Sequence, residues 1–158
     1  MRIGHGYDVH RFTDGNAVII GGISISYEKT LLAHSDGDVL IHAIADALLG
    51  AAGERDIGYH FPDNSDDYKN IDSKILLKKV KEIITQKGFE IEYIDSTIVA
   101  QAPKMAPYIE KMREALSKTL EIDTSLINVK ATTEEKLGFT GRKEGISAHA
   151  VCLLKSKE

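Results

Sequence analysis

The chain has 158 residues, of which 42% are apolar and 28% charged, and its formal net charge is −4. This length suits one domain that buries about 68–70% of the surface exposed by its unfolded chain. No apolar run approaches the roughly 20 residues of a membrane span, and an acidic chain without a basic stripe is not typical of a nucleic-acid-binding protein. We therefore expect neither a membrane nor a nucleic acid among its partners.

The first residues, MRIGHGYDVH, resemble neither a signal peptide nor a transit sequence, because both the basic, apolar and small-residue succession and the Ser- and Arg-rich composition are missing. We predict a cytoplasmic protein of bacterial type, or the mature form of a plastid protein. The single cysteine, Cys152, lies in the apolar run AVCLLK, which predicts a buried strand residue rather than a nucleophile.

The first predicted elements are two short strands and a helix. The strands cover 1–9 and 17–26, and the segment RFTDGN between them contains an Asp-Gly pair, which favours a hairpin turn. The segment SDGDVLIHAIADALLGAAG, 35–53, has apolar residues at helical spacing and predicts a helix of about four turns. Ser35 or Asp36 is expected to cap its start.

The rest of the chain predicts a surface loop followed by alternating helices and strands. ERDIGYHFPDNSDDYKN, 54–70, has no periodicity and predicts the loop. Helices are predicted at 72–88 and 102–120, and strands at 89–101, 126–132 and 146–155. Without a repeat or a linker, this order predicts a single α+β domain over 1–158, with helices packed on one face of a mixed sheet.

A candidate metal site comes from two separate segments. Residues two apart on a strand face the same side, so Asp8 and His10 would present an oxygen and a nitrogen together. His42 lies on the first predicted helix in a polar stripe, with aspartates four residues before and after it. Three such ligands would leave one position of a zinc ion open, as in catalytic sites, although hydrogen-bonded structure explains the same spacing. The glycines on both sides of His5 predict a close backbone approach where the strand meets its ligand.

Two further segments fit either helix capping or phosphate binding. His34 and Ser35 precede the first predicted helix, where free N–H groups favour a phosphate, but Ser35 and Asp38 also fit a capping pair. In TTEEK, Thr132 and Glu135 have the spacing of a capping box. Adjacent threonines and a carboxylate also suit phosphate oxygens and a magnesium ion, so both interpretations stay open.

Five segments together resemble one enzyme family: GHGYDVH, SDGDVLIHAIADALLGAAG, FPD, AQAPKM and KATTEEKLGFTGR. The family is the 2-C-methyl-D-erythritol 2,4-cyclodiphosphate synthases of non-mevalonate isoprenoid biosynthesis, and the similarity runs from end to end. It implies conversion of 4-diphosphocytidyl-2-C-methyl-D-erythritol 2-phosphate to the cyclodiphosphate and CMP, by metal-assisted intramolecular phosphoryl transfer. It also implies a homotrimer whose active sites lie between adjacent subunits.

The resemblance also implies roles for individual residues. The family's zinc ligands match Asp8, His10 and His42, and its ligand for a second ion, Mg²⁺ or Mn²⁺, matches Glu135. The residues that stabilise the transition state match His34 and Thr133. The substrate-binding positions match Asp8, Val9, His10, His34, Ser35, Asp56, Ile57, Gly58, Phe61, Pro62, Asp63, Asn64, Ser65, Ala100, Gln101, Ala102, Pro103, Lys104, Met105, Ala106, Thr132, Thr133, Glu134, Glu135, Phe139 and Arg142. Of these, Phe139 and Arg142 fall near the trimer axis, where an isoprenoid diphosphate would fit.

Two other classes of function would use the same residues. A zinc-dependent nucleotide-diphosphate hydrolase would direct water at the diphosphate, and a binding module would hold nucleotides or isoprenoid diphosphates without chemistry. An open metal position has little use in a pure binder. A substrate phosphate is already an ionised nucleophile, so the cyclising reaction needs no nucleophilic side chain, and no Ser-His-Asp or Cys-His pairing is evident.

Overall fold

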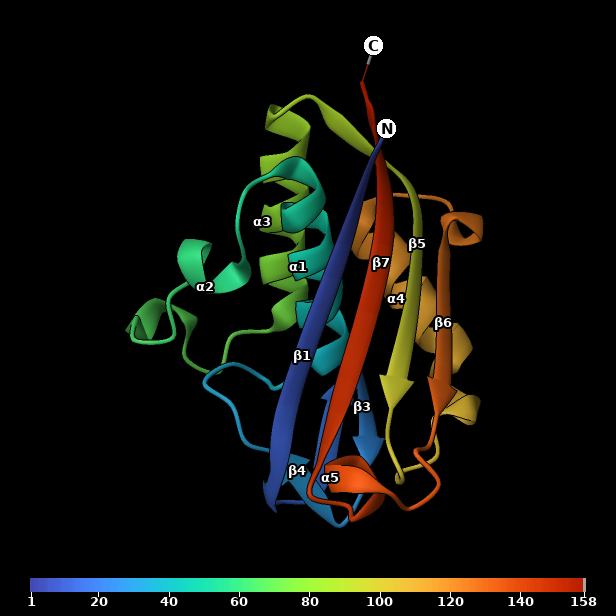
Figure 1. The fold of residues 1–158 in the computed structure, drawn as a ribbon. Coiled ribbons are helices and arrows are strands. Elements are labelled where there is room, and N and C mark those ends of the chain that lie inside the picture. The colour runs from blue at the N-terminus through green and yellow to red at the C-terminus, as the bar shows by residue number, and fades with distance from the viewer. Residues whose placement is uncertain (158) are drawn as a thin grey trace.

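The computed structural model describes residues 1–157, and its main feature is a five-stranded sheet with the order β4-β1-β7-β5-β6 (Figure 1). These strands are β1 (Arg2–Asp14), β4 (Lys29–Leu31), β5 (Phe89–Val99), β6 (Ile127–Thr132) and β7 (Gly145–Ser156). β5 and β6 run parallel, and every other pair of neighbours is antiparallel. A separate two-stranded ribbon contains β2 (Ala17–Ile20) and β3 (Ile23–Ser26). The sheet is therefore mixed, as predicted.

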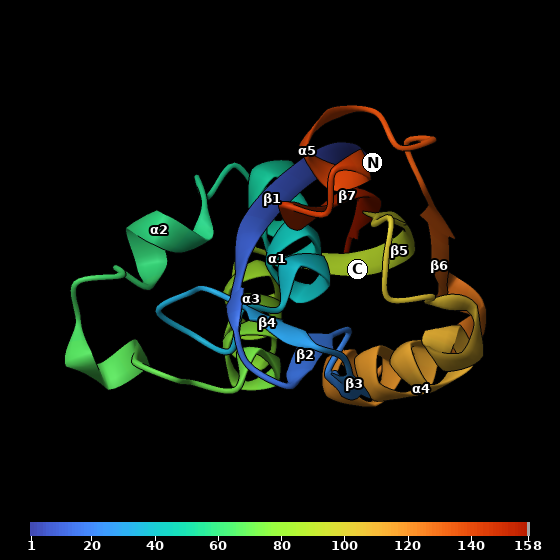
Figure 2. The ribbon, with the colours of Figure 1, turned by 90° about the horizontal axis from the view of Figure 1, so that it is seen from below.

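Three helices cover one face of this sheet, as the two ribbon views show (Figures 1 and 2). They are α1 (Val39–Ala52), α3 (Ser73–Gln86) and α4 (Ile109–Leu120), and each lies within a helix predicted from the sequence. α1 is buried almost all round because it contacts β1 and β7 on one side and α3 on the other. In residues 1–157, no helix has the length and apolar character needed to cross a membrane.

The remaining helical segments are short. α2 (Ile57–His60) and a 3₁₀ turn at Asp66–Tyr68 interrupt the predicted surface loop, and α5 (Gly138–Gly141) precedes β7. Two more 3₁₀ turns lie at Ala106–Tyr108 and Thr124–Leu126. Cys152 is buried on β7, as predicted, and burial raises the pKa of its thiol to about 12. A thiol in this state is a poor nucleophile.

The predicted hairpin between 1–9 and 17–26 is wrong. β1 continues to Asp14 and pairs with β7 and β4, so the Asp-Gly pair does not turn the chain back onto β1. The segment 17–26 instead folds on itself across Gly21 and Gly22, whose φ angles of 62° and 76° suit a two-residue hairpin turn. Pairing with a distant strand therefore outweighs the local turn preference of RFTDGN.

Two glycines allow β1 to lie directly against α1, so the close backbone approach predicted at these glycines is to a helix rather than to a ligand. A β-carbon added at Gly6 would lie 1.8 Å from the carbonyl oxygen of Ala43, and one added at Gly4 would lie 1.9 Å from that of Ala47. Any larger residue would hold the strand and the helix apart. The close contact brings the helix that carries His42 against the strand that carries the other two candidate ligands.

Candidate active site

Three side chains converge between β1 and α1: Asp8, His10 and His42. Asp8 Oδ2 lies 2.9 Å from His42 Nδ1 and 3.0 Å from His10 Nε2, and these two nitrogens are 3.4 Å apart. A tetrahedral ion with bonds of about 2.1 Å would hold its ligand atoms about 3.4 Å from one another. Two of the three distances are shorter than this value, and one carboxylate oxygen and two imidazole nitrogens this close together could hold a metal ion. The structure therefore brings together the three residues expected as ligands.

Mutual contacts set the charges of this group. Burial acts to raise the pKa of Asp8, but hydrogen bonds from His10 and His42 outweigh it and lower that pKa to about 2. Burial acts to lower the pKa of His42, but the hydrogen bond to Asp8 and the charge of Asp8 outweigh it and raise that pKa. Two imidazoles thus contact one carboxylate at the point where a cation would bind.

The second ring nitrogen of His42 faces the protein interior. Nε2 lies 2.8 Å from Ser73 Oγ and 3.3 Å from Ser35 Oγ. Ser73 Oγ donates to Asp36 Oδ1 at 2.5 Å, and the Ser73 N–H donates to Asp36 Oδ2 at 2.9 Å. The sequence contains no signal for Ser73 at this site, because it belongs to α3 and only the folded chain brings it to His42.

A cavity of about 230 Å³ opens beside the three candidate ligands. Eight of the predicted substrate-binding residues line it: Asp8, His10, His34, Ser35, Ile57, Gly58, Phe61 and Asp63. The loop that contains α2 forms one wall, and the Ile57 N–H donates to Asp46 Oδ1 at 2.8 Å, which fixes that loop to α1. The polar stripe predicted on the helix therefore faces the cavity at His42 and Asp46.

The other predicted residues of this loop lie next to the cavity rather than in its lining. Asp56 caps α2 by accepting from the Tyr59 N–H at 2.9 Å. His34 Nε2 lies 2.9 Å from the Ser65 carbonyl oxygen, so the ring can donate to it and hold the loop in place. Pro62 and Asn64 lie between the lining residues of the same loop but are not part of the lining.

The helix that carries His42 begins later than predicted. Its N-cap is Asp38, not Ser35 or Asp36, and the Asp38 carboxylate accepts from the Ile41 N–H at 3.0 Å. The same carboxylate accepts from two glycine N–H groups of the β2–β3 turn, at 2.9 and 2.7 Å. Burial raises the pKa of Asp38 to about 6, although these three bonds lower it. A phosphate at His34 and Ser35 would therefore contact the loop before α1 rather than the free N–H groups of the helix.

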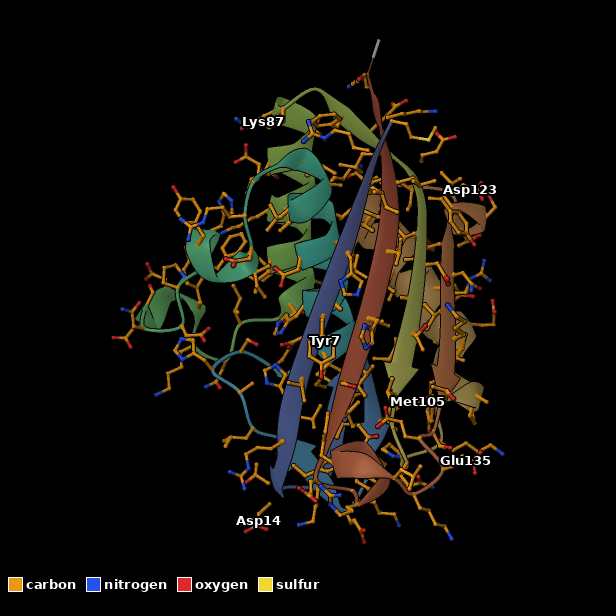
Figure 3. All side chains as sticks on the ribbon, in the orientation of Figure 1. Tyr7, Asp14, Lys87, Met105, Asp123 and Glu135 are labelled. Carbon is orange, nitrogen blue, oxygen red and sulfur yellow. The ribbon has the colours of Figure 1, made fainter. Side chains whose placement is uncertain are left out.

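A second group of predicted residues lies where β5 and β6 end (Figure 3). The run 100–106, which contains Met105, follows β5, and the run 132–135, which contains Glu135, begins at the last residue of β6. The two runs adjoin, since the Ala100 N–H donates to the Thr132 carbonyl oxygen at 3.0 Å.

The predicted capping box at Thr132 and Glu135 is wrong. The chain turns there, with positive φ angles of 55° at Glu135 and 64° at Lys136, and α5 begins only at Gly138. The Glu135 N–H donates to Thr133 Oγ1 at 3.2 Å, which holds the turn. Glu134 accepts a hydrogen bond from Thr140, so its carboxylate is directed toward α5.

The strand register separates these two groups of residues within one chain. Asp8 pairs with Ala148 on β7, and Ala148 pairs with Ile98 on β5. Ile98 in turn pairs with Ala131 on β6. At about 4.8 Å per strand, Asp8 and Ala131 are about 14 Å apart. Among residues 1–157, the side chains that could hold a metal ion together are Asp8, His10 and His42, and Glu135 is not close enough to join them.

A second cavity, of about 570 Å³, borders the later half of β1. It brings Val9 and Phe139 together, two residues that the family resemblance assigns to ligand binding. Arg142 lies outside this lining and forms an ion pair with Glu144. The basic residues that line this second cavity are Arg11, Lys29 and Lys143.

The fold and the site define a member of the YgbB family: the model of that family matches residues 1–155, and the chain belongs to it. A protein of Pseudomonas entomophila (strain L48) is 60% identical over 154 residues, which are 98% of each chain. One of Geobacillus sp. (strain WCH70) is 59% identical over 157 residues, 99% of each chain. Both are named 2-C-methyl-D-erythritol 2,4-cyclodiphosphate synthase.

Solved structures agree with these relatives. IspF of Plasmodium falciparum, in a CDP complex, is 38% identical with a TM-score of 0.87, over 99% of this chain and 97% of that one. The bifunctional IspDF of Campylobacter jejuni is 43% identical with a TM-score of 0.96, over 99% of this chain, which spans 42% of that longer protein. The family resemblance read from the sequence is therefore confirmed, and with it the class of enzyme, a cyclising synthase.

Proposed function

We propose that this chain converts 4-diphosphocytidyl-2-C-methyl-D-erythritol 2-phosphate to 2-C-methyl-D-erythritol 2,4-cyclodiphosphate and CMP. The observation that carries the proposal is the convergence of Asp8, His10 and His42 beside a cavity lined by the expected substrate residues, in a chain 60% identical to a named synthase. CDP in a related structure supports a cytidine diphosphate substrate. None of the relatives described above supports the hydrolase alternative.

We propose zinc as the ion at Asp8, His10 and His42, because the donor set and its spacing suit that metal. Glu135 is the proposed ligand of a second ion, Mg²⁺ or Mn²⁺, which also needs substrate phosphates because Mg²⁺ uses few protein carboxylates. When bound, the two ions supply positive charge that offsets the repulsion between the 2-phosphate and the diphosphate.

The side chains around the cavity then have one main task, which is to hold the substrate folded. The 2-phosphate oxygen forms a bond to the β-phosphorus, and the bond from that phosphorus to the oxygen of CMP breaks. We propose that His34, together with Thr133 from a neighbouring chain, donates hydrogen bonds to the charge that develops. Because both reacting groups belong to one molecule, effective molarities of about 10⁵ M or more become accessible through positioning alone. The run 100–106 is proposed to hold the cytosine, 56–58 the ribose and 61–63 the methylerythritol.

We propose a homotrimer whose active sites lie between subunits. The distance between Asp8 and the β6 end within one chain supports this, since a neighbouring chain could supply Thr133 and Glu135 to the cavity. The sheet face opposite the helices also carries several exposed apolar side chains, and Tyr7 lies on it (Figure 3). Its exposed apolar residues are Ile3, Tyr7, Val9, Tyr93 and Val151. Three such faces packed together would be buried, and a monomer in sedimentation equilibrium would contradict this proposal.

The cavity at Val9 and Phe139 supports a binding role for an isoprenoid diphosphate, because a few apolar side chains and several cationic ones meet there. A calorimetric titration with geranyl diphosphate, with inorganic diphosphate as the control, tests this. We also propose a cytoplasmic location, which the bacterial origin of the relatives supports.

Turnover in ¹⁸O-labelled water tests the reaction. In the cyclising reaction the attacking oxygen belongs to the substrate, so CMP is released and no solvent oxygen enters either product. Mass spectrometry of both products, normalised to the CMP released, should find no label. One ¹⁸O atom per turnover in a ring-opened bisphosphate would show attack by water and overturn the cyclase proposal.

A further inference from the structure

We propose that Ser73 and Asp36 are positioning residues for the metal ligand His42. Ser73 Oγ accepts from His42 Nε2 and donates to Asp36, and this chain of hydrogen bonds makes Nδ1 the nitrogen that faces the metal. The inference rests on the proposed zinc site and adds the residues that orient one of its ligands.

The geometry leaves the His42 ring little freedom. One nitrogen, Nδ1, lies 2.9 Å from Asp8 Oδ2, and the other, Nε2, lies 2.8 Å from Ser73 Oγ. The His42 side chain is 7% exposed and Ser73 is completely buried, so water cannot easily replace either contact. A ring held at both nitrogens stays in one rotamer, with Nδ1 directed at the candidate metal position.

The order of donors and acceptors in the hydrogen bonds from His42 through Ser73 to Asp36 fits metal binding through Nδ1. A nitrogen that binds a metal carries no proton, so the hydrogen of a neutral His42 must lie on Nε2, which then donates to Ser73 Oγ. The Ser73 hydroxyl has one hydrogen of its own, and it donates this to Asp36 Oδ1 at 2.5 Å. Because a carboxylate only accepts, Asp36 fixes the direction of both hydrogen bonds, from His42 to Ser73 and from Ser73 to Asp36.

Asp36 is itself held in place from two directions. The Ser73 N–H donates to Oδ2 at 2.9 Å, and the Asp38 N–H donates to Oδ1 at 3.1 Å. Ser73 is the first residue of α3, and Asp38 is the N-cap of α1. Asp36 therefore connects the starts of two helices, and the position of Ser73 relative to His42 is part of the packing of those helices.

Ser35 offers a weaker contact to the same nitrogen and is the matched control. Its Oγ lies 3.3 Å from His42 Nε2, and the Gly37 N–H donates to the same oxygen at 3.3 Å. Both distances at Ser35 Oγ are longer than those at Ser73 Oγ. Within residues 1–157, the Ser35 hydroxyl donates no hydrogen bond to a carboxylate. The two serines thus differ in what orients them while sharing one partner.

The test compares zinc affinity in Ser73→Ala, Ser35→Ala and His42→Ala with the wild-type protein, by competition with a chromophoric chelator. Loss of an outer partner of a ligating histidine typically weakens metal binding about 10–100-fold, and we expect this for Ser73→Ala. Ser35→Ala should stay within about threefold of wild type, and His42→Ala should lose tight binding. Thermal unfolding of the metal-free proteins separates an effect on the ligand from a general loss of fold.

Several results would overturn the proposal. Equal zinc affinity in Ser73→Ala and wild type would overturn it, and so would equal losses in Ser73→Ala and Ser35→Ala. Wild-type protein that binds no zinc would overturn the proposed metal site itself, and with it the role of Ser73 and Asp36. That result differs from the two above, in which the zinc site stands and only the positioning role fails. If Ser73→Ala does not fold, ¹⁵N NMR of the zinc-loaded wild type decides, because the proposal requires the His42 proton on Nε2.

Discussion

Replacement of Gly6 by alanine should destabilise the protein and weaken the candidate metal site together. The new β-carbon would lie 1.8 Å from the Ala43 carbonyl oxygen, whereas a carbon and an oxygen in contact need about 3.3 Å. β1 and α1 would have to separate by about 1.5 Å, and both partners in the clash are backbone. Overpacking typically costs 1–3 kcal/mol, so we expect Gly6→Ala to lower the free energy of unfolding by about 3 kcal/mol. The same separation moves His42 away from Asp8.

Urea unfolding followed by circular dichroism measures the first effect, and chelator competition measures the loss of zinc affinity. All variants are compared at one protein concentration, because assembly shifts apparent stability. Gly50→Ala is the matched control, since a β-carbon at this position of α1 would have no atom nearer than the His5 carbonyl oxygen at 4.0 Å. It should stabilise the helix by about 0.5–1 kcal/mol. A Gly6→Ala protein within about 0.5 kcal/mol of wild type would refute the reasoning.

Three further variants or reagents test the site and the core. His42→Ala should leave two ligands and lose the bound zinc, and elemental analysis that finds the metal undiminished would remove His42 from the site. Glu135→Gln should keep the zinc but lose turnover, and a normal rate of cyclisation across a magnesium titration would contradict its role. Cys152, whose pKa burial raises to about 12, should not react with a thiol reagent at pH 8 in the native protein but should react in urea. Rapid labelling of the folded protein would contradict its burial.

The helices were predictable because their signals are local. α1, α3 and α4 each bury apolar residues at helical spacing, and Asp72 caps α3. Most strands were located for similar reasons, although β4 was not predicted and the predicted strand 17–26 is two strands, β2 and β3. The partners of the strands were not predicted, because pairing depends on residues far apart in the chain. β1 illustrates this: the turn chemistry at its end is typical of a hairpin, yet ten of its 13 residues, Arg2–Arg11, pair with β7.

The metal-binding group was predictable from two features, strand alternation at Asp8 and His10 and the polar face of the helix at His42. The parts that the sequence did not predict depend on competition between nearby polar groups. Asp36 does not cap α1 because its carboxylate binds Ser73 and the Asp38 N–H. Such a choice follows from where α3 begins in space, and no local pattern contains that information.

The central place of β7 in the sheet has a consequence for how the protein is made. β7 follows every other element in the chain, yet it lies between β1 and β5 and pairs with both along most of its length. Until β7 leaves the ribosome, β1 and β5 remain edge strands with unpaired backbone groups, which are open to pairing with other chains. Premature termination before Gly145 should therefore yield an aggregation-prone product rather than a partly active one, and biosynthesis at a slowed rate should prolong the same hazard.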